Sequence, residues 1–347
     1  MFHNAGRLAF QILKANLNSL QFPFKLTFCV TFRCQSRCKT CSIWQLKPEN
    51  ELTLDEIKKF IKKADFLSWI NLTGGEVFLR DDLIDICKIF AKERKIFLLN
   101  FATNGLMPSV IHQKVKEILQ LPIDRIVIGV SLDGPQSLND DIRGIKGDWK
   151  KGMQTFLELK GLTKKNKKFR TYIGYTLSDY NTQKFQEFYQ EIKKEIPDIK
   201  EHDIHINLAH QSPHYYHTNQ SQTSKIDLKE LERIILFKRF SLNPINWLEK
   251  QYISYAKQFI LTAKTPLPCH AIQTSCYIDS WGNVYPCTIY DKKIGSLRES
   301  EYDLAKIIKS QPAVETKKEV KELHCPNCWT PCEAYQMILS NIIKKNK

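Results

Sequence analysis

Three cysteines fall within eight residues near the start of the chain, in residues 32–44 (FRCQSRCKTCSIW). Cys34, Cys38 and Cys41 have the spacing Cys-x3-Cys-x2-Cys, and thiolates are ligands of both zinc and iron–sulfur clusters. A structural zinc site is closed by four protein ligands, whereas three thiolates on a four-iron cluster leave one iron free to bind a substrate group. The spacing therefore indicates a cluster that takes part in chemistry. A zinc site completed by a distant fourth ligand is the alternative.

The other cysteines are also grouped, which favours metal binding over a disulfide framework. The chain has 11 cysteines and no secretory signal in residues 1–20, so we expect a reducing, cytoplasmic setting in which dense thiols serve metal or redox chemistry. The two later groups are Cys269, Cys276 and Cys287, and Cys325, Cys328 and Cys332. Cys29 and Cys87 stand alone in apolar sequence and are predicted to be small buried hydrophobic residues.

Composition and charge limit the class of protein. Of the 347 residues, 42% are hydrophobic and 26% are charged, which predicts a folded soluble protein with a substantial core. No apolar run approaches the roughly 20 residues needed to cross a bilayer. The net charge of +15 comes mostly from lysines scattered over helical segments, without the aromatic and arginine stripe of a nucleic-acid-binding surface. We therefore expect a solvated basic face and no nucleic-acid partner, and salt-dependent RNA binding would contradict this.

The polar motifs of the chain must be held by the strands that precede them. Six strands are predicted at residues 24–32, 68–73, 95–103, 125–133, 169–177 and 203–210. The predicted helices between them cover residues 53–64, 81–94, 108–120, 148–163 and 182–195, with start signals at Thr53 and Pro108. This alternation predicts parallel strands covered by helices, in a partial (β/α)6 TIM-like barrel. In such barrels the reactive groups gather at the C-terminal ends of the strands.

Five segments are expected along the chain. Residues 1–22 are predicted to form an amphipathic helix that packs on the body of the protein rather than anchoring it at a membrane surface. The partial barrel is expected at residues 23–210, a helical linker at 211–265, a small cysteine-rich module at 266–332 and a C-terminal helix at 333–347. The module is short and rich in loops, so we expect it to have little core and to be stabilised by bound metal.

Four further motifs accompany the first cysteines along the barrel. LTGGEVFLR follows the second strand, ATNG the third and VSLDGP the fourth, with DDIRG just beyond. Together with Cys-x3-Cys-x2-Cys, these motifs resemble the radical S-adenosylmethionine (SAM) superfamily. The resemblance implies that SAM is bound by Gly74, Gly75, Glu76, Thr103, Asn104, Ser131, Asp133 and Arg143. The residue types suit this task, because glycines let the backbone approach a ligand, a carboxylate accepts from an ammonium, and an arginine fork binds a carboxylate.

The resemblance also implies an activity and its cofactors. Members of the superfamily hold a [4Fe–4S] cluster through three cysteines and SAM, here Cys34, Cys38 and Cys41, and cleave SAM reductively to a 5′-deoxyadenosyl radical that abstracts hydrogen from a substrate. The implied partners are a low-potential electron donor such as flavodoxin or ferredoxin, and a small-molecule or peptide substrate. The protein is then expected to position the reacting carbon and to exclude water. The alternative is a non-catalytic iron–sulfur or zinc-binding protein of the same fold.

The later cysteines resemble the auxiliary-cluster module called SPASM and its shortened form, twitch. The pattern Cys-x12-Gly-x4-Cys followed by Cys-x2-Cys is formed by Cys269, Gly282, Cys287, Cys325 and Cys328. The resemblance implies one auxiliary [4Fe–4S] cluster on these four cysteines. The intervening YIDSWGNVYPC is predicted to be a β-hairpin that turns at WGN. Cys276 and Cys332 are left over as less certain ligands that could replace one of the four, and a zinc ribbon is the alternative.

The motifs do not identify the substrate. Five histidines crowd into the segment that ends the sixth strand: His202, His205, His210, His214 and His217. Of these, His210, His214 and His217, together with Tyr215 and Tyr216, are candidates to bind substrate or to move protons near neutral pH. A polar surface loop with strand histidines is an equal or better alternative. His205 and His210 differ in strand parity, so both cannot face the barrel interior.

Overall fold

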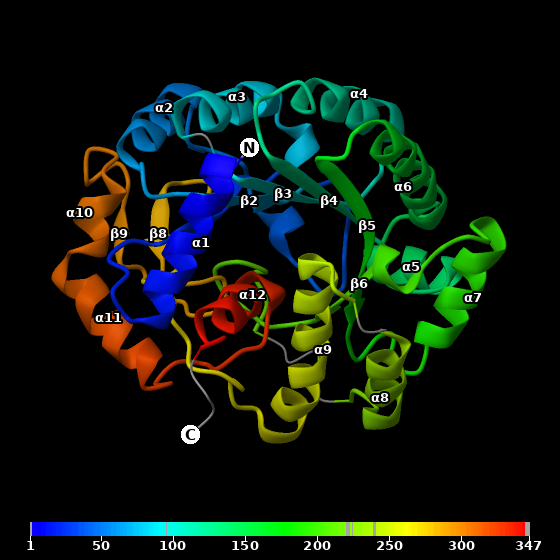
Figure 1. Ribbon diagram of the computed structural model, residues 1–347. Helices are drawn as coiled ribbons and strands as arrows, with labels where there is room; N and C mark the ends of the chain where they lie inside the picture. Colours follow the sequence, from blue (N-terminus) through cyan, green and yellow to red (C-terminus); the bar gives the residue numbers. More distant parts are fainter. Residues whose placement is uncertain (1, 95, 220–222, 224, 239–240, 344–347) are drawn as a thin grey trace.

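One nine-stranded sheet forms the centre of the molecule within the residues that the computed structural model describes, namely 2–94, 96–219, 223, 225–238 and 241–343. The strand order is β6-β5-β4-β3-β2-β1-β7-β8-β9 (Figure 1). The strands are β1 (Lys25–Thr31), β2 (Trp69–Gly74), β3 (Leu98–Thr103), β4 (Arg125–Ser131), β5 (Phe169–Leu177), β6 (Ile204–Leu208), β7 (Ser275–Ile278), β8 (Asn283–Tyr285) and β9 (Gly295–Ser296). Strands β1 to β7 pair in parallel, and only the β7–β8 and β8–β9 pairs are antiparallel. The sheet is an open partial barrel with β6 and β9 at its edges.

Helices cover the outer face of the sheet and lie across its open side. They are α1 (Phe2–Asn16), α2 (Leu54–Lys63), α3 (Leu83–Arg94), α4 (Pro108–Ile118), α5 (Gln136–Arg143), α6 (Asp148–Lys165), α7 (Phe185–Glu195), α8 (Leu228–Phe237), α9 (Pro244–Thr262), α10 (Leu304–Ile308), α11 (Gln311–Lys321) and α12 (Pro331–Ser340). In Figure 1, α2, α3, α4 and α6 form an arc over the outer face, whereas α9 and α12 lie on the opposite side. No helix in the described ranges is long and apolar enough to cross a membrane.

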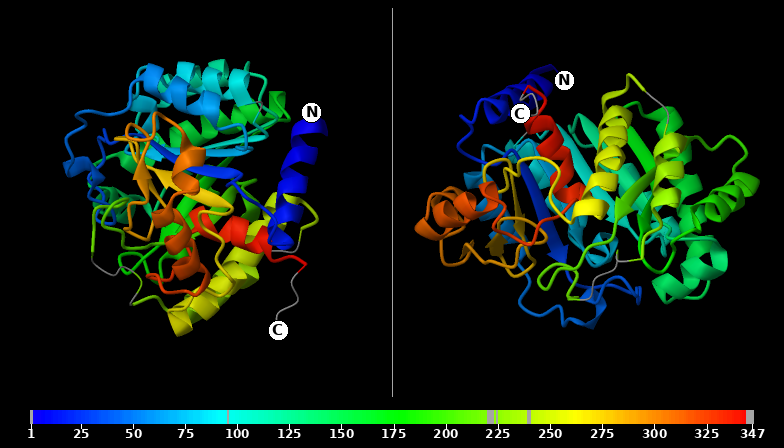
Figure 2. Two further views of the ribbon diagram at one scale, coloured as in Figure 1. Left: turned by 90° about the vertical axis from the view of Figure 1, so that its left-hand side faces the viewer. Right: turned by 90° about the horizontal axis from the view of Figure 1, so that it is seen from below.

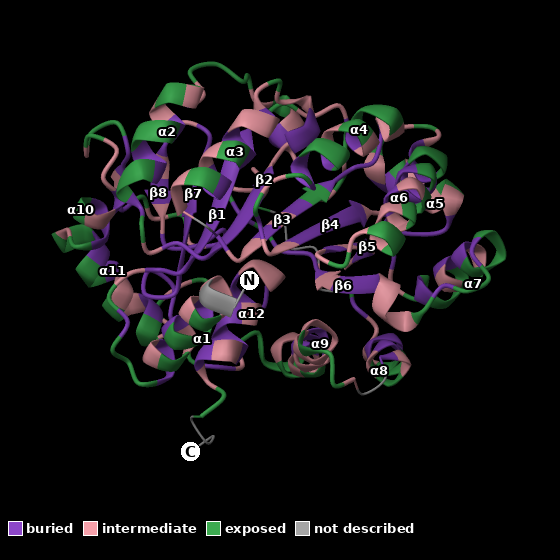
Figure 3. Ribbon diagram, turned by 45° about the horizontal axis from the view of Figure 1, so that its top comes forward, coloured by how far each residue is buried: buried purple, intermediate pink, exposed green. Residues whose placement is uncertain are grey.

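Strand β1, inside the sheet, shows why the barrel strands have apolar runs in their sequences. All seven of its residues are buried, because β2 and β7 pair with its two edges and helices cover its face. In the register, Phe28 lies beside Leu72 of β2 and Ile278 of β7. Figure 3 shows that most of the sheet is buried and that the helices expose their outer faces. Strand β3 is less covered, with Ala102 exposed.

The start signals of two helices act as predicted. Thr53 is the N-cap of α2, where its side chain accepts from the backbone N–H of Glu56 while the Glu56 side chain accepts from the N–H of Thr53. Pro108 is the first residue of α4. The partial barrel is confirmed. The ends of the six predicted strands differ from the observed ends by three residues at most, and those of β5 agree. Parts of the predictions, at Lys95, 220–222, 224, 239–240 and 344–347, lie outside the described residues.

Three helices were not predicted. The helix α5 has the sequence QSLNDDIR, whose serine, asparagine and aspartate residues favour turns, and α10 is only five residues long. The helix α11 starts after Ser310 with Pro312 in its first turn, a start signal that the sequence analysis did not use. Of these helices, α5 packs against α6, and α10 packs against α2 and α11.

The cysteine-rich region continues the barrel sheet. The predicted hairpin is present as β7 and β8, paired antiparallel between Tyr277 and Tyr285, and β7 also pairs in parallel with β1. Ile278, Val284 and Leu297 are buried in the main hydrophobic cluster. The expectation of little core in this region is therefore wrong, because the region shares the core of the barrel. The five segment boundaries stay predictions.

Candidate functional site

The first three cysteines lie in the loop after β1, at the C-terminal end of the parallel strands. Cys34, Cys38 and Cys41 are half-buried. The pKa of Cys38 is raised to about 11 and that of Cys41 to about 12, chiefly by burial, with the neighbouring thiols of the group acting in the same direction. This mutual effect requires the three thiols to lie close together. Isolated from a metal, they would remain protonated near neutral pH, so this group is suited to metal-stabilised thiolates.

The cysteine loop is held in place by the end of α5. The backbone N–H of Arg37 donates to the carbonyl of Arg143 at 2.9 Å, and that of Lys39 donates to Ile142 at 2.8 Å. Gly144 follows with a φ of +68°, and a Cβ there would lie 2.5 Å from the carbonyl oxygen of Arg37. The motif DDIRG therefore supports the loop with its backbone as well as with its arginine.

The two glycines after β2 allow a close approach to the same loop. A Cβ on Gly74 would lie 2.1 Å from the carbonyl oxygen of Thr31, and one on Gly75 would lie 2.1 Å from that of Arg33. The N–H of Gly75 donates to Thr31 at 2.8 Å, and the N–H of Glu76 donates to Arg33 at 2.7 Å. The GGE motif is thus locked against the residues that immediately precede Cys34.

The carboxylate of Glu76 is buried. It links its own motif, LTGGEVFLR, to ATNG and, through Asn104, to the cysteine motif. Its Oε1 accepts from Thr103 Oγ1 at 2.9 Å and from the N–H of Phe78 at 3.1 Å, and its Oε2 accepts from the N–H of Asn104 at 2.7 Å. Burial raises the pKa of Glu76, and these donors oppose the shift. Asn104 in turn donates to Ser36 Oγ at 3.0 Å, between Cys34 and Cys38. The sequence analysis missed Ser36, whose only signal was its position inside the cysteine motif.

A buried ion pair lies beside Cys38. Arg143 donates to Asp133 Oδ2 at 3.1 Å and lies 3.9 Å from Asp148. Burial alone would lower the pKa of Arg143, but Cys38, Asp133 and Asp148 raise it. Among the described residues its buried Nε has no hydrogen-bond partner, and Asp148 Oδ2 lies 3.9 Å from it. Asp133 also accepts from the N–H of Thr176 at 2.9 Å and so anchors the arginine, while Ser131 ends β4 half-buried.

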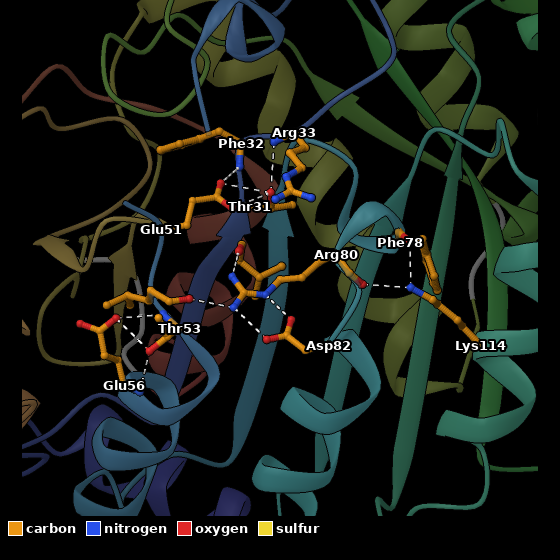
Figure 4. A network of polar contacts seen from close by, with 12 residues as sticks. Thr31, Phe32, Arg33, Glu51, Thr53, Glu56, Phe78, Arg80, Asp82 and Lys114 are labelled. Atoms are coloured by element: carbon orange, nitrogen blue, oxygen red, sulfur yellow. Dashed lines mark hydrogen bonds and ion pairs between the residues drawn. The ribbon is translucent and has the colours of Figure 1, made fainter. Parts of the chain in front are cut away.

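A second polar network fixes the start of the cysteine loop from outside (Figure 4). Glu51 accepts from the N–H of Phe32 at 2.6 Å and from Thr31 Oγ1. Arg80 pairs with Asp82 at 2.6 Å and donates to the carbonyls of Val30 and Leu52. The end of β1, the GGE loop and the approach to α2 are thereby joined. Glu51 and Asp82 lie outside the motifs, and Arg80 is the last residue of LTGGEVFLR. The sequence analysis assigned no role to any of the three.

Four of the later cysteines line one pocket of about 320 Å³. Its lining comprises Cys269, Cys287, Cys325 and Cys328 together with apolar side chains and Glu333. Burial raises the pKa of all four thiols, and the cysteines add to one another's shifts, as Cys287 does for Cys269 and Cys328. The N–H groups of Ile289 and Tyr290 point at Cys287 Sγ at 3.4 and 3.2 Å. The pocket thus combines four thiols with backbone donors that stabilise a thiolate.

The two remaining cysteines lie outside this lining. Cys276 is in β7 beside Leu26, fully buried in the sheet. Cys332 is in the first turn of α12, where its carbonyl accepts from the buried Lys25 Nζ. Cys29 and Cys87 are fully buried, as predicted. In the described part of the chain, no group of three or more histidine, cysteine, aspartate or glutamate side chains could hold a single metal ion.

A short loop at 212–218 contacts both cysteine sites. The N–H of Ser42, next to Cys41, donates to the carbonyl of Tyr216 at 2.8 Å. Tyr215 Oη lies 2.6 Å from Thr73 Oγ1, directly before the two glycines. His214 Nε2 lies 3.0 Å from the carbonyl oxygen of Cys287. Residues 214–217 of this loop belong to the segment predicted to bind substrate, to move protons or to form a polar surface loop. The loop joins the two cysteine regions.

The five histidines do not form one site. His205 is at the start of β6, stacked on Tyr172 and 2.6 Å from Glu249, away from the cysteine rim. His210 packs against Phe259 of α9, and burial lowers its pKa to about 4. His214 and His217 do lie near the cysteine loops, His217 with its ring against Phe32. Of the candidate histidines, His210 packs against α9, and the substrate role stays a prediction for His214 and His217, which lie near the cysteine loops.

Comparison with protein families decides the kind of domain. Residues 28–192 match the Radical SAM superfamily, and residues 269–329 match the iron–sulfur cluster-binding domain SPASM. The chain therefore contains a radical SAM domain followed by a SPASM domain. The SPASM match begins at Cys269 and ends just after Cys328, so it contains the four cysteines of the pocket.

Curated relatives resemble the radical SAM part. The chain is 30% identical over 154 residues to the antilisterial bacteriocin subtilosin biosynthesis protein AlbA of Bacillus subtilis, a match that covers 42% of this chain and 32% of AlbA. It is 35% identical over 123 residues to the Fe-coproporphyrin III synthase of Methanosarcina barkeri, covering 34% of this chain and 29% of that protein. The chain thus spans about a third of the length of these relatives.

Solved structures share the fold over almost the whole chain. SuiB of Streptococcus suis bound to S-adenosylmethionine has a TM-score of 0.60 at 17% identity, covering 96% of this chain and 77% of SuiB. The enzyme anSMEcpe with bound AdoMet has a TM-score of 0.54 at 14% identity, covering 92% of this chain and 97% of that chain. At these identities the likeness shows that the fold is shared, and nothing more.

The residues present fit the cofactors that the two domains imply, SAM and [4Fe–4S] clusters. In the first site, three neighbouring thiols, a buried carboxylate and an arginine side chain lie on one rim of the barrel. The second offers four thiols around one pocket. Thiolates are the usual protein ligands of iron–sulfur clusters, and the unequal numbers of thiols agree with one open and one closed cluster.

Proposed function

We propose that the chain cleaves SAM reductively and uses the resulting 5′-deoxyadenosyl radical to abstract hydrogen from a substrate. The observation that carries this proposal is the connection from the cysteine loop through Ser36 and Asn104 to Glu76. This connection fixes the positions of three thiols and a buried carboxylate relative to one another. They lie on the rim of a barrel that matches the Radical SAM superfamily. When bound, the cluster supplies the electron that breaks the sulfonium bond.

The protein residues would bind and orient SAM. A carboxylate has about four lone-pair sites, and three are used on Glu76 by Thr103, Phe78 and Asn104, which leaves about one for the ammonium of SAM. Arg143 would bind the SAM carboxylate through guanidinium N–H groups other than the one on Nη1 that donates to Asp133. Gly74 and Gly75 would leave the backbone accessible to the ligand.

A second cluster is proposed at the pocket of about 320 Å³ formed by the later cysteines. Cys269, Cys287, Cys325 and Cys328 would be its four ligands, which would suit electron transfer. This assignment leaves Cys276 and Cys332 out, because they lie outside the pocket lining. A zinc ion at the same cysteines is the competing assignment, and metal analysis separates the two.

The proposed substrate is a peptide side chain or a small metabolite, reached beside the 212–218 loop. AlbA takes part in bacteriocin biosynthesis, and SuiB has been solved with its precursor peptide SuiA, which supports the peptide class. The loop supports this place because it contacts both cysteine sites through Tyr216 and His214. A low-potential donor such as flavodoxin or ferredoxin would supply the electron.

The test compares anaerobically reconstituted wild type with a Cys34→Ala/Cys38→Ala/Cys41→Ala variant. Iron, zinc and 5′-deoxyadenosine are measured after addition of SAM and a strong reductant. We expect about eight iron atoms per wild-type chain and about four in the variant, with deoxyadenosine formed only by wild type. Zinc in place of iron, or no deoxyadenosine from a fully loaded protein, would refute the catalytic proposal and favour a binding protein.

A further inference from the structure

The N-terminal helix α1 has an apolar face on its outside as well as on its inside. Leu8 and Ala15 are buried against the body of the protein, with Ile12 beside them. On the opposite side, Phe10 is 57% exposed, Leu13 43% and, in the turn after the helix, Leu17 63%. Residues 10, 13 and 17 are spaced by three and four, so they share one face. Amphipathic helices of soluble domains normally place polar residues there.

The end of α12 extends this outer face. The N–H of Ile343 donates to Asn16 Oδ1 at 3.1 Å, and Asn16 Nδ2 donates to the carbonyl of Leu339 at 2.8 Å. Ile342 and Ile343 are 56% and 59% exposed. In both views of Figure 2, α1 lies along an edge of the molecule and α12 approaches it. Five of the twelve exposed large hydrophobic residues in the described ranges therefore gather here: Phe10, Leu13, Leu17, Ile342 and Ile343, called the terminal patch below.

Contacts on other sides of α1 hold it against the body of the protein, so its outer face is not used for this packing. Gln11 Nε2 donates to the carbonyl of Phe66 at 2.6 Å, and Ser68 Oγ donates to Gln11 Oε1 at 2.6 Å. Arg7 donates to the carbonyl of Leu67 at 3.1 Å. These contacts lie at the start of β2, so α1 is fixed at the N-terminal ends of the strands, opposite the cysteine loop. The terminal patch is thus presented by a rigid support, away from the site.

The parts of the sequence that carry the terminal patch contain basic residues and no acidic ones, while in the fold Asp65 lies beside Arg7. The sequence has no acidic residue before Glu49 and none after Glu333. Arg7 and Lys14 lie on α1, with Lys14 Nζ 4.7 Å from the centre of the Phe10 ring. In the sequence, Lys344, Lys345 and Lys347 follow the two isoleucines. Lys14 lies at the terminal patch, and the chain has a net charge of +15. This apolar surface is therefore complementary to an anionic lipid surface, where basic side chains add to the attraction.

We propose that the terminal patch docks onto the surface of an anionic lipid bilayer, with the three α1 residues and the two isoleucines in the headgroup region. A second copy of the chain is a poorer occupant, because a two-fold contact through this face would bring the same basic residues together. Docking through the N-terminal ends of the strands leaves the rim with the cysteine loop facing water. The proposal is independent of the proposed radical chemistry.

The test is co-sedimentation of the reconstituted full chain with lipid vesicles. One set of vesicles is phosphatidylcholine alone, and the other contains about 30% phosphatidylglycerol. The variant Phe10→Ser/Leu13→Ser/Leu17→Ser is compared with a control, Leu236→Ser/Leu242→Ser/Leu261→Ser, which changes three residues that are 79%, 90% and 59% exposed elsewhere. Iron content and thermal unfolding establish that each protein is folded.

We expect wild type and the control to bind the anionic vesicles, with binding that weakens as salt is added. The patch variant should bind at least about tenfold more weakly, because three apolar side chains no longer enter the headgroup region. No binding by wild type, or equal weakening by the two variants, would overturn the proposal. Sedimentation velocity without lipid covers the remaining case: a wild-type dimer that the patch substitutions dissociate would assign the patch to a second copy and refute lipid docking.

Discussion

At the scale of single residues, the site depends on close approaches that only a few residue types permit. Gly75 lies so near the cysteine loop that a Cβ would be 2.1 Å from the carbonyl oxygen of Arg33. Both partners are backbone, so neither can move aside as a flexible side chain would. The position of the loop that carries Cys34 is therefore tied directly to the absence of a side chain at residue 75.

Gly75→Ala is expected to displace the cysteine loop and weaken both the first cluster and SAM binding. The added methyl group must push the strand ends apart, so the affinity for SAM should fall at least about tenfold. Iron content and the SAM-induced change in the electron paramagnetic resonance of the reduced cluster measure this. Gly161→Ala is the matched control, because nothing lies within 4 Å of a Cβ there in α6. Full iron and an unchanged SAM response in Gly75→Ala would contradict the assignment.

At the scale of elements, α9 is attached to the edge strand β6 by a buried charge cluster. Glu249 of α9 lies 2.6 Å from His205 and 3.1 Å from Lys238, and its side chain is only 3% exposed. It also accepts from the N–H of Ile206 at 2.9 Å. Burial alone would raise the pKa of Glu249, but His205 and Lys238 lower it to about 2. The open side of the barrel is held partly by this carboxylate.

Glu249→Gln is expected to destabilise the protein by about 3 kcal/mol at neutral pH, because Lys238 remains buried without its partner charge. The folded pKa of about 2 lies below the ordinary value of 4.5. The contribution of the carboxylate is therefore complete above about pH 4.5 and is lost as the pH falls toward 2. Denaturant unfolding of variant and wild type should converge at low pH.

The exposed pair of Lys257 and Glu232, 2.6 Å apart and about half exposed, gives the control for this prediction. Glu232→Gln should change the free energy of unfolding by less than about 0.5 kcal/mol, since exposed ion pairs contribute little. Equal effects of the two substitutions would show that the Glu249 cluster does not hold α9.

At the scale of the whole molecule, β7 brings the two cysteine regions into one sheet. It pairs with β1, the strand that leads into the first cysteine loop. The two regions are joined again where the 212–218 loop contacts Ser42 and Cys287. Of the six later cysteines, this arrangement brings four to one pocket and leaves Cys276 in the sheet.

The two kinds of later cysteine should therefore respond differently to substitution. Cys328→Ser is expected to lower bound iron by about four atoms per chain, because a ligand of the pocket is removed. Cys276→Ser should keep the full iron content, since its side chain is buried in β7 outside the pocket. Anaerobic reconstitution with iron and sulfide analysis measures both. If Cys276→Ser loses the auxiliary iron and Cys328→Ser does not, the proposed set of four ligands is wrong.

The sequence by itself determined the strand–helix alternation, the partial barrel and the order of the motifs on its rim. These are local properties, since a buried parallel strand such as β1 reads as an apolar run and a capped helix such as α2 carries Thr53 and Glu56 at fixed spacing. It also determined the cysteine groups, because thiol spacing is visible without a fold.

Only the tertiary structure decided which groups meet. The pairing of β7 with β1 joins residues about 250 positions apart in the chain, and no local pattern specifies such a partner. The same holds for the link from Asn104 to Ser36, for the separation of Cys276 from the pocket, and for the dispersal of the five histidines. Each depends on the packing of distant elements, which fixes side-chain directions that spacing along the chain does not contain.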